Sequence, residues 1–339
     1  MDYVRLGSTG TKVSRLCLGC MAFGAGQDWM LNEADSVPIL KKAYEAGINF
    51  YDTANVYSNG ESERILGRAL KQFGANRDDM VIATKVFFQM GKSLNERGLS
   101  RKNIMSAIDA SLSRLGMDYV DLYQIHRFDY ETPMEETLEA LSEVVRAGKA
   151  RYIGASSMFA WQFAQYLDMA DAKGLARFVT MQNHYSLAYR EEEREMIPLC
   201  DAEGIGIMPY SPLAGGFLVG TAAAGTLRSQ SLMMRGRFAR PEDKAVVSAL
   251  REVAANRGAK PAEIAIAWLL SKPNVTPIIG PSKLHHMDDP LKAVATKLEA
   301  SELAALAAPY VSQDVMGAMR PGELEVMLRR FAQAVRPRG

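Results

Sequence analysis

Short apolar runs alternate with amphipathic stretches along nearly the whole chain. Eight such runs occupy residues 15–19, 48–54, 80–86, 119–126, 150–157, 178–183, 205–212 and 275–282. Stretches between them, such as 34–47, 61–74, 100–116 and 133–148, carry apolar residues at three- and four-residue spacing, and most end on glycine as helices do. Alternating strands and helices favour parallel strands joined by crossover helices. Eight units predict an α/β fold, a (β/α)8 TIM barrel; a doubly wound sheet is the alternative.

Two segments interrupt this alternation. Residues 3–14, YVRLGSTGTKVS, are typical of a β-hairpin, which we expect to close the barrel floor. A long insert rich in Gly, Ala and Arg follows the seventh strand over residues 213–243, where barrel loops often bind ligands. We expect a single barrel domain over residues 1–316. Residues 317–339 are expected to form a C-terminal appendage with a short amphipathic helix after a Pro-Gly break.

The composition is that of a soluble globular protein, with 339 residues, 48% hydrophobic, 23% charged and a net charge of +1. This balance argues against nucleic-acid and anionic-membrane partners. No apolar run reaches the roughly 18 residues of a membrane span, and the start, MDYVRLGSTG, has no apolar signal-peptide core. We therefore expect a cytoplasmic location, which also suits the odd count of three cysteines.

Two of the cysteines, Cys17 and Cys20, form a C-x-x-C pair. A redox or metal role usually needs a helix beginning directly after the pair, and here an apolar strand runs into a Gly-rich loop. Packing is therefore the favoured interpretation, with redox or metal binding as the alternative. We expect no metal site.

Four polar side chains follow the ends of consecutive predicted strands, where barrel enzymes place their function. They are Asp52, Tyr57, Lys85 and His126. Tyrosine is a weak acid at neutral pH, and a nearby Lys85 ammonium would favour the phenolate and lower its pKa. Asp52 would hold the lysine, and His126 would hydrogen-bond the oxygen that receives the proton. Such a set suits protonation of a carbonyl oxygen while a cofactor delivers hydride to its carbon.

Long motifs in the chain resemble those of the aldo-keto reductases. They are GINFYDTANVYSNGESERILGRAL, VIATKV, MDYVDLYQIHRFD, GKARYIGASSM and PIIGPSK, and the resemblance covers about residues 3–311. SRLCLGCM and YREEEREMIPLC resemble a bacterial subgroup. The resemblance implies a (β/α)8 barrel that uses NADPH to reduce an aldehyde or ketone to an alcohol. By position it implies that Tyr57 is the general acid, Lys85 lowers its pKa, Asp52 holds Lys85, and His126 orients the substrate carbonyl.

No GxGxxG fingerprint follows a strand, so a Rossmann-type cofactor site is not expected. The resemblance implies that an extended NADPH contacts Ser156 and Gln182 with its carboxamide and stacks its nicotinamide on Tyr210. Without the resemblance, Gln182 could tie down a loop and Tyr210 could be ordinary core. The resemblance assigns the phosphate and adenosine contacts to Ser211, Leu213, Gly215, Ser282, Lys283, His286 and Asp289. A Ser-Lys pair before a helix suits an anion, which favours NADP over NAD.

Three positions depart from the family pattern. Ser157 replaces an asparagine, and Thr221 replaces a lysine, so that Arg228 or Arg237 would meet the pyrophosphate charge. Asp289-Pro290 replaces Glu-Asn in the adenine site. His286 would either touch the 2′-phosphate or be plain surface.

The substrate is expected to be a small-molecule carbonyl compound. Aromatic and Met-rich walls favour apolar or aromatic compounds, and the candidate wall residues are Met21, Phe23, Trp29, Phe87, Phe88, Arg127 and Phe128. Arg127 would attract an anion or, by the favoured interpretation, be a rim charge. Two alternatives remain: a Schiff-base aldolase or lyase that uses Lys85, and a non-catalytic NADPH-sensing subunit. The physiological substrate, the reaction direction and the oligomeric state do not follow from the sequence.

Overall fold

The computed structural model describes residues 1–26, 29–220, 238 and 240–335. These residues divide into two compact units, each built from three segments of the chain. Unit 1 comprises Met1–Gly19, Pro38–Phe50 and Asn183–Val315, and unit 2 comprises Cys20–Val37, Tyr51–Gln182 and Met316–Gly339. The predicted division into a domain of residues 1–316 and an appendage of 317–339 stays a prediction.

Eight strands form one sheet in the order β10-β3-β4-β5-β6-β7-β8-β9. Each strand lies inside one of the predicted apolar runs: β3 (Cys17–Gly19), β4 (Phe50–Asp52), β5 (Val81–Val86), β6 (Val120–Ile125), β7 (Ala150–Ser156), β8 (Phe178–Gln182), β9 (Gly206–Ile207) and β10 (Ile278–Ile279). In unit 1 the chain after β9 also bonds to β10, through Ile278 N and Pro209 O at 2.8 Å. This is the topology of the (β/α)8 fold, as predicted.

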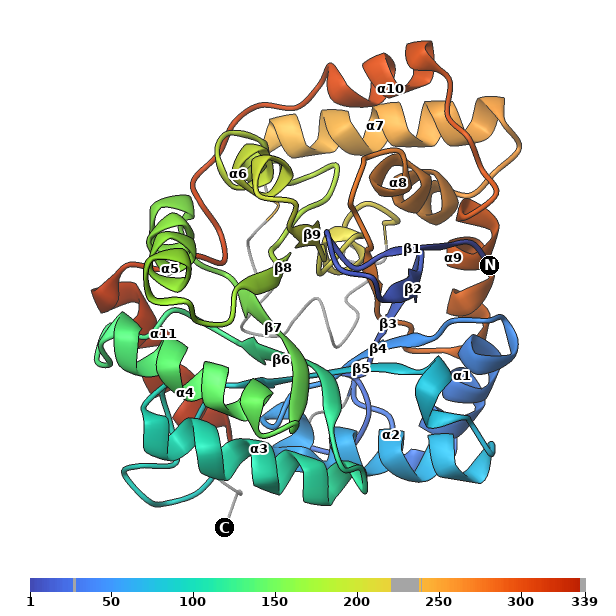
Figure 1. The fold of residues 1–339 in the computed structure, drawn as a ribbon. Coiled ribbons are helices and arrows are strands. Elements are labelled where there is room, and N and C mark those ends of the chain that lie inside the picture. The colour runs from blue at the N-terminus through green and yellow to red at the C-terminus, as the bar shows by residue number, and fades with distance from the viewer. Residues whose placement is uncertain (27–28, 221–237, 239, 336–339) are drawn as a thin grey trace. The chain divides into compact units, whose positions relative to one another are not determined.

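Unit 2 carries helices that connect its parallel strands. They are α2 (Glu61–Gln72), α3 (Arg101–Leu115), α4 (Met134–Arg146) and α5 (Ala160–Lys173), together with α11 (Pro321–Val335) near the end of the chain. Neighbouring helices pack side by side, α2 on α3, α3 on α4 and α4 on α5 (Figure 1). The chain before α11 is tied to the unit by Tyr130, whose hydroxyl donates to Met319 O at 2.9 Å.

Unit 1 contains the predicted hairpin, formed by the antiparallel strands β1 (Tyr3–Arg5) and β2 (Lys12–Ser14). Its loop bonds to the chain just before β9, through Ser8 N and Gly204 O at 2.8 Å. Its second strand bonds to the residue just before β4, through Ser14 N and Asn49 Oδ1 at 2.7 Å. The hairpin therefore contacts the amino ends of these strands, where a barrel floor is expected.

The helices of unit 1 are α6 (Met196–Ala202), α7 (Pro241–Asn256), α8 (Pro261–Leu270), α9 (Asp288–Ala293) and α10 (Ala300–Ala307). Helix α7 packs against both α8 and α10 (Figure 1). A further helix, α1 (Glu33–Glu45), contributes residues to both units. Short 3₁₀ turns occupy Tyr57–Gly60, Arg77–Asp79, Glu191–Glu193, Ala214–Gly216 and Leu284–Met287. Among the described residues, no helix combines the length with the apolar composition that a membrane span requires.

Helices α2 and α3 approach closely at Gly67. A Cβ atom at this position would lie 2.0 Å from the backbone oxygen of Leu115, at the end of α3. Contacts this short force a backbone to move, so the glycine permits the packing of the two helices.

We predict that Gly67→Ala destabilises the protein by about 1–3 kcal/mol, the usual cost of overpacking, despite the better helix propensity of alanine. Chemical denaturation followed by circular dichroism measures this loss. Gly322→Ala is the matched control, because nothing lies within 4 Å of its added Cβ. Equal stability of the two variants would contradict the packing role.

Candidate active site

Asp52 and Lys85 lie on neighbouring strands of unit 2. The chain leaving β4 continues the ladder with β5, since Thr53 N donates to Ala83 O at 2.9 Å and Asn55 N donates to Lys85 O at 3.2 Å. The ammonium of Lys85 donates to Asp52 Oδ2 at 2.5 Å. Both side chains are buried, with exposed fractions of 0% for Lys85 and 3% for Asp52.

The three hydrogens of the Lys85 ammonium all have acceptors. Besides Asp52, Nζ donates to Thr53 O at 2.8 Å and to the hydroxyl oxygen of Tyr57 at 3.2 Å. An ammonium has only three donors and no acceptor. The bonding of Lys85 is therefore complete within unit 2, and one of its three bonds goes to the predicted proton donor.

Tyr57 begins a 3₁₀ turn that leads into α2. The next three residues are left-handed, with φ of 47° at Ser58, 52° at Asn59 and 87° at Gly60. Non-glycine residues in this region cost about 1–3 kcal/mol each. Ser58 offsets part of this cost, because its hydroxyl donates to Phe23 O at 3.1 Å. The strained turn directly follows Tyr57 and leads the chain into α2, while the Tyr57 hydroxyl stays within 3.2 Å of Lys85 Nζ.

Two glutamines bind the other oxygen of Asp52. Gln124 Nε2 and Gln182 Nε2 each donate to Asp52 Oδ1 at 2.9 Å. Gln182 Nε2 also donates to Gln124 Oε1 at 3.1 Å. Gln182 was predicted from the family pattern, whereas Gln124 was missed. Its signal was its position two residues before His126, which puts both side chains on one face of β6.

Burial raises the pKa of Tyr57 above its ordinary value of 10.0, and the charge of Asp52 adds to this effect. The charges of Lys85 and Arg127 and the bond from Lys85 lower the pKa by less. Lys85 therefore lowers the pKa of Tyr57, as predicted, but desolvation of the phenolate is the larger effect and the net pKa is raised. At neutral pH the phenol is protonated, as a proton donor must be.

Burial alone would lower the pKa of Lys85, but the charge of Asp52 and the hydrogen bonds to Asp52 and Tyr57 outweigh burial, and the pKa is raised. The lysine is therefore a cation at neutral pH. Its charge stabilises a phenolate at Tyr57 whenever the phenol loses its proton.

His126 directly follows β6 and is buried. Its ring lies edge-on to Tyr57, with centroids 5.6 Å apart, and to Phe88, with centroids 4.9 Å apart. Burial, followed by the charges of Lys85 and Arg127, lowers the pKa of His126 well below its ordinary value of 6.5. The imidazole is neutral at neutral pH, so it can donate one hydrogen bond without competing as an acid.

Arg127 is not the exposed rim charge favoured by the sequence, since its exposed fraction is only 7%. Its Nη1 donates to His126 O at 2.6 Å, and its guanidinium carbon lies 5.7 Å from the centre of the Phe88 ring. Among the other predicted wall residues, Phe23, Phe87, Phe88 and Phe128 are buried, whereas Met21 and Trp29 are partly exposed.

The structure places Ser156 and Gln182 opposite each other in the pairing of β7 with β8. The Ser156 hydroxyl donates to the backbone oxygen of Gln182 at 2.8 Å. The next residue, Ser157, has φ of 54°, a left-handed conformation that asparagine adopts more readily than serine. Both predicted carboxamide contacts thus lie in unit 2, with Gln182 bonded to Asp52.

In unit 1, Tyr210 belongs to a stack of three rings. His184 lies parallel to Tyr210, with centroids 5.4 Å apart and an angle of 10°, and parallel to Tyr189, with centroids 4.7 Å apart and an angle of 9°. Tyr189 and His184 are buried, but Tyr210 is only half-buried. Tyr210 is therefore not ordinary core, and its ring is supported on one face by His184, which sequence reasoning missed.

The predicted phosphate residues of unit 1 lie on two turns. On the first, which includes Leu213, φ is positive at Ser211 (55°), Ala214 (50°) and Gly215 (65°). Successive N–H groups in such turns form concavities that bind anions. On the second, Ser282 Oγ lies 3.4 Å from His286 Nδ1, and Lys283 is exposed. A cation, a hydroxyl and an imidazole form a donor set that suits phosphate oxygens.

The remaining predicted cofactor residues have other partners or are not described. Asp289 forms an ion pair with Lys260 Nζ at 3.2 Å, and Pro290 beside it is buried. Burial, followed by the neighbouring charges of His285 and Lys283, lowers the pKa of His286. Thr221, Arg228 and Arg237 lie outside the described residues.

All three cysteines are buried and free of disulfides. Burial raises the pKa of Cys20, which disfavours the thiolate that redox or metal chemistry needs. Within the described part of the chain, no three His, Cys, Asp or Glu side chains are grouped so as to hold a metal ion.

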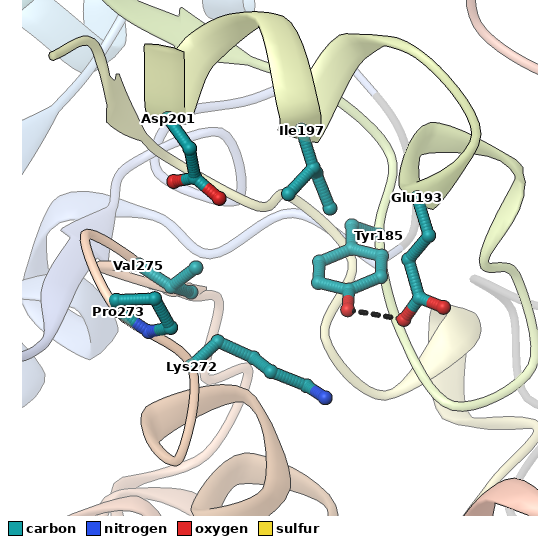
Figure 2. A pocket seen from close by; sticks show the side chains of 7 residues that line it. All are labelled: Tyr185, Glu193, Ile197, Asp201, Lys272, Pro273 and Val275. Atoms are coloured by element: carbon teal, nitrogen blue, oxygen red, sulfur yellow. Dashed lines mark hydrogen bonds between the residues drawn. The ribbon is translucent and has the colours of Figure 1, made fainter.

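Figure 2 shows a pocket of about 170 Å³ in unit 1. Glu193 accepts a hydrogen bond from the Tyr185 hydroxyl at 2.6 Å on one side, and Asp201, Pro273 and Val275 lie on the other. The pocket is lined by Tyr185, Glu193, Ile197, Asp201, Lys272, Pro273 and Val275. None of these is a predicted site residue.

The sequence model of one protein family, described as the aldo/keto reductase family, matches residues 15–310. This chain belongs to the aldo/keto reductase family. The match includes all four strand-end residues of unit 2 and both predicted phosphate turns of unit 1. The family suggested by the sequence motifs is therefore confirmed.

Named relatives of this aldo/keto reductase are similar over nearly their full lengths. Versiconal hemiacetal acetate reductase from Aspergillus parasiticus is 43% identical, over 95% of this chain and 100% of that protein. An aldo-keto reductase from Fusarium vanettenii is 40% identical over 94% and 93%. A putative aryl-alcohol dehydrogenase from Schizosaccharomyces pombe is 40% identical over 93% and 97%. These relatives are fungal, so the resemblance to a bacterial subgroup stays a prediction.

We predict that Arg127→Met raises the pKa of His126 toward 6.5, because the variant removes one of the charges that lower it. A pH titration of the histidine ring carbons by NMR measures the change. Arg97→Met is the matched control, since Arg97 is an exposed arginine paired with Glu131. A pKa of His126 that is equal in the two variants would contradict the electrostatic role of Arg127.

Proposed function

We propose that this protein reduces an aldehyde or ketone to an alcohol, with NADPH as hydride source and Tyr57 as proton donor. The observation that carries the proposal is the hydrogen-bonded series Asp52–Lys85–Tyr57, which holds a protonated phenol beside a fixed ammonium. Membership in the aldo/keto reductase family and the names of the relatives support reduction of a carbonyl group.

The residues of the chain fit a nicotinamide dinucleotide. In unit 1, the half-buried Tyr210 ring backed by His184 suits a flat ring. The turn at Ser211–Gly215 suits a pyrophosphate, and Ser282 with Lys283 suits a 2′-phosphate, which favours NADPH over NADH. In unit 2, Gln182 uses its amide hydrogens on Asp52 and Gln124, so we propose that its Oε1 receives the carboxamide.

When bound, the cofactor supplies a hydride to the carbonyl carbon. The chain supplies the proton: the Tyr57 hydroxyl gives its hydrogen to the carbonyl oxygen, and the resulting phenolate is stabilised by the Lys85 ammonium. Asp52 holds that ammonium in place. The neutral His126 donates its ring N–H to the same carbonyl oxygen and orients it toward Tyr57.

We propose apolar or aromatic carbonyl compounds as the substrate class. Three buried phenylalanines support this class. Phe88 contacts the ring of His126 directly, Phe87 precedes Phe88 in the sequence, and Phe128 lies two residues after His126. The name of one relative, a putative aryl-alcohol dehydrogenase, supports an aromatic substrate. We also propose a cytoplasmic location, which suits three cysteines that form no disulfide.

The Schiff-base alternative is disfavoured by the state of Lys85. Nucleophilic attack needs a neutral amine, whereas the raised pKa and three hydrogen bonds of Lys85 favour the ammonium. The non-catalytic alternative predicts NADPH binding without oxidation in the presence of any carbonyl compound.

We predict that Tyr57→Phe lowers kcat by about 10²–10⁴-fold, the range for loss of one general acid. The ring is retained, so NADPH affinity should change little. NADPH oxidation is measured across aliphatic, aromatic and sugar aldehydes and bulky ketones, with fluorescence titration for cofactor binding. Unchanged turnover in the variant would rule out Tyr57 as the proton donor.

We predict that Lys283→Ala raises the KM for NADPH several-fold and leaves the KM for NADH almost unchanged, because only NADPH carries the 2′-phosphate. Steady-state kinetics with both cofactors test this difference. Lys292→Ala, which changes an exposed lysine of α9, is the control. An equal rise for both cofactors would argue against a 2′-phosphate site at Lys283.

A further inference from the structure

We propose that Gln124 is a positioning residue that, together with Gln182, holds the Asp52 carboxylate toward Lys85 and so controls the proton donor Tyr57. This inference rests on the proposed function, in which Tyr57 gives the proton. It concerns a residue outside the four predicted catalytic positions, and it acts only through Asp52 and Lys85.

The contacts of Gln124 lead to Asp52. Its side chain is fully buried, its Nε2 donates to Asp52 Oδ1, and its Oε1 accepts from Gln182 Nε2. Gln124 is the register partner of Lys85 in the pairing of β5 with β6. The residue is therefore placed by the sheet beside the ion pair, and both ends of its amide are used there.

The two carboxylate oxygens of Asp52 accept from different donors, and this difference fixes the orientation of the carboxylate. Oδ1 accepts two amide hydrogens and Oδ2 accepts from Lys85. The terminal torsion of an aspartate is broad and does not select one orientation by itself. Two amides on Oδ1 select the orientation in which Oδ2 faces the ammonium. Lys85 also bonds to Tyr57. If the Asp52 carboxylate is less well oriented, the ammonium that stabilises the phenolate is therefore less well held.

The backbone makes room for this glutamine. Gly154 on β7 is the register partner of Gln124, and a Cβ there would lie 3.0 Å from Gln124 Cγ and 2.4 Å from Thr180 Oγ1. Gly154 has no positive φ in this structure, so its conformation does not require glycine. The absence of a Cβ at Gly154 leaves space for Thr180, where the clash would be shortest, and for the Gln124 side chain.

A purely structural role for Gln124 makes a different prediction from a positioning role. A buried polar side chain that only satisfies its neighbours affects stability when it is changed. A positioning residue also changes how the rate depends on pH, because its substitution alters the charges around Tyr57. The test therefore needs a titration as well as a rate.

The first variant is Gln124→Glu, which keeps the shape of the side chain and replaces its amide by a group that titrates. A protonated Glu at this position donates to Asp52 Oδ1 and restores the bond, whereas an ionised one repels Asp52. When two adjacent carboxyl groups share a proton, the pKa for losing that proton is raised. The protonated form is the active one, so we expect near-normal kcat at low pH and a new loss of kcat as pH rises through that pKa.

The second variant is Gln124→Met, which removes the amide at similar volume and cannot titrate. We expect kcat to fall about tenfold, the effect of losing one hydrogen bond to a charged group, with no new pH-dependent step. Tyr123→Phe is the matched control. It removes a buried hydrogen bond from the same strand, to Ile104 O at 3.3 Å in α3, and should leave both kcat and the pH profile unchanged.

A second readout needs neither cofactor nor turnover. In protein labelled with ¹³C at tyrosine Cζ, the Tyr57 resonance is identified by its loss in Tyr57→Phe. We expect this resonance and its titration to shift in both Gln124 variants and to stay in place in Tyr123→Phe. Should one Gln124 variant fail to fold by circular dichroism, the other decides the outcome.

The outcomes separate this inference from the proposed function. If Tyr57→Phe abolishes turnover but the Gln124 variants match Tyr123→Phe in rate, pH profile and Tyr57 resonance, the positioning role is wrong and carbonyl reduction stands. If the native protein does not oxidise NADPH in the presence of any carbonyl compound tested, the proposed function fails. The NMR comparison then still decides whether Gln124 acts on Tyr57 through Asp52 and Lys85.

Discussion

The buried ion pair between Asp52 and Lys85 is the interaction on which the site depends. Removing two such ions from water costs several kcal/mol each, and only complete hydrogen bonding offsets this cost. Here every ammonium hydrogen and both carboxylate oxygens are bonded. Strands β4, β5, β6 and β8 each supply or border one of these groups. A shift in register of β4 or β5 would leave a buried charge without its partner, and a shift of β6 or β8 would remove a hydrogen bond to Asp52. The pair therefore ties the chemistry to the sheet.

Most of the fold follows from the order of apolar runs. Each of the eight runs contains one strand, because parallel strands buried on both faces read as continuous apolar segments. The hairpin over residues 3–14 was equally readable from its turn residues. The extent of α11 could not be predicted in this way, since a bond such as that from Tyr130 to Met319 joins residues far apart in the sequence. Local patterns carry no information about such contacts.

Part of the site could also be predicted, because the apolar runs locate the ends of the strands. Strand ends identify Asp52, Lys85 and His126, but Gln124 lies within an apolar strand, where its one local signal, the position two residues before His126, was missed. Its importance depends on register with Lys85, which only the paired strands reveal. The sign of the Tyr57 pKa shift was also beyond the sequence. It depends on how far burial outweighs one neighbouring charge, and burial is a property of the folded chain.

Gly154 has a consequence for how sequences of this kind can diverge. A Cβ at this position would lie 2.4 Å from Thr180 Oγ1 on β8 and 3.0 Å from Gln124 Cγ on β6, so the glycine serves both neighbouring strands. A chain that gains a larger residue at Gly154 must therefore make room at Thr180 first and also at Gln124. A substitution at Gly154 should be accompanied by changes on both flanking strands across lineages, although none of the three positions is among the four predicted catalytic residues.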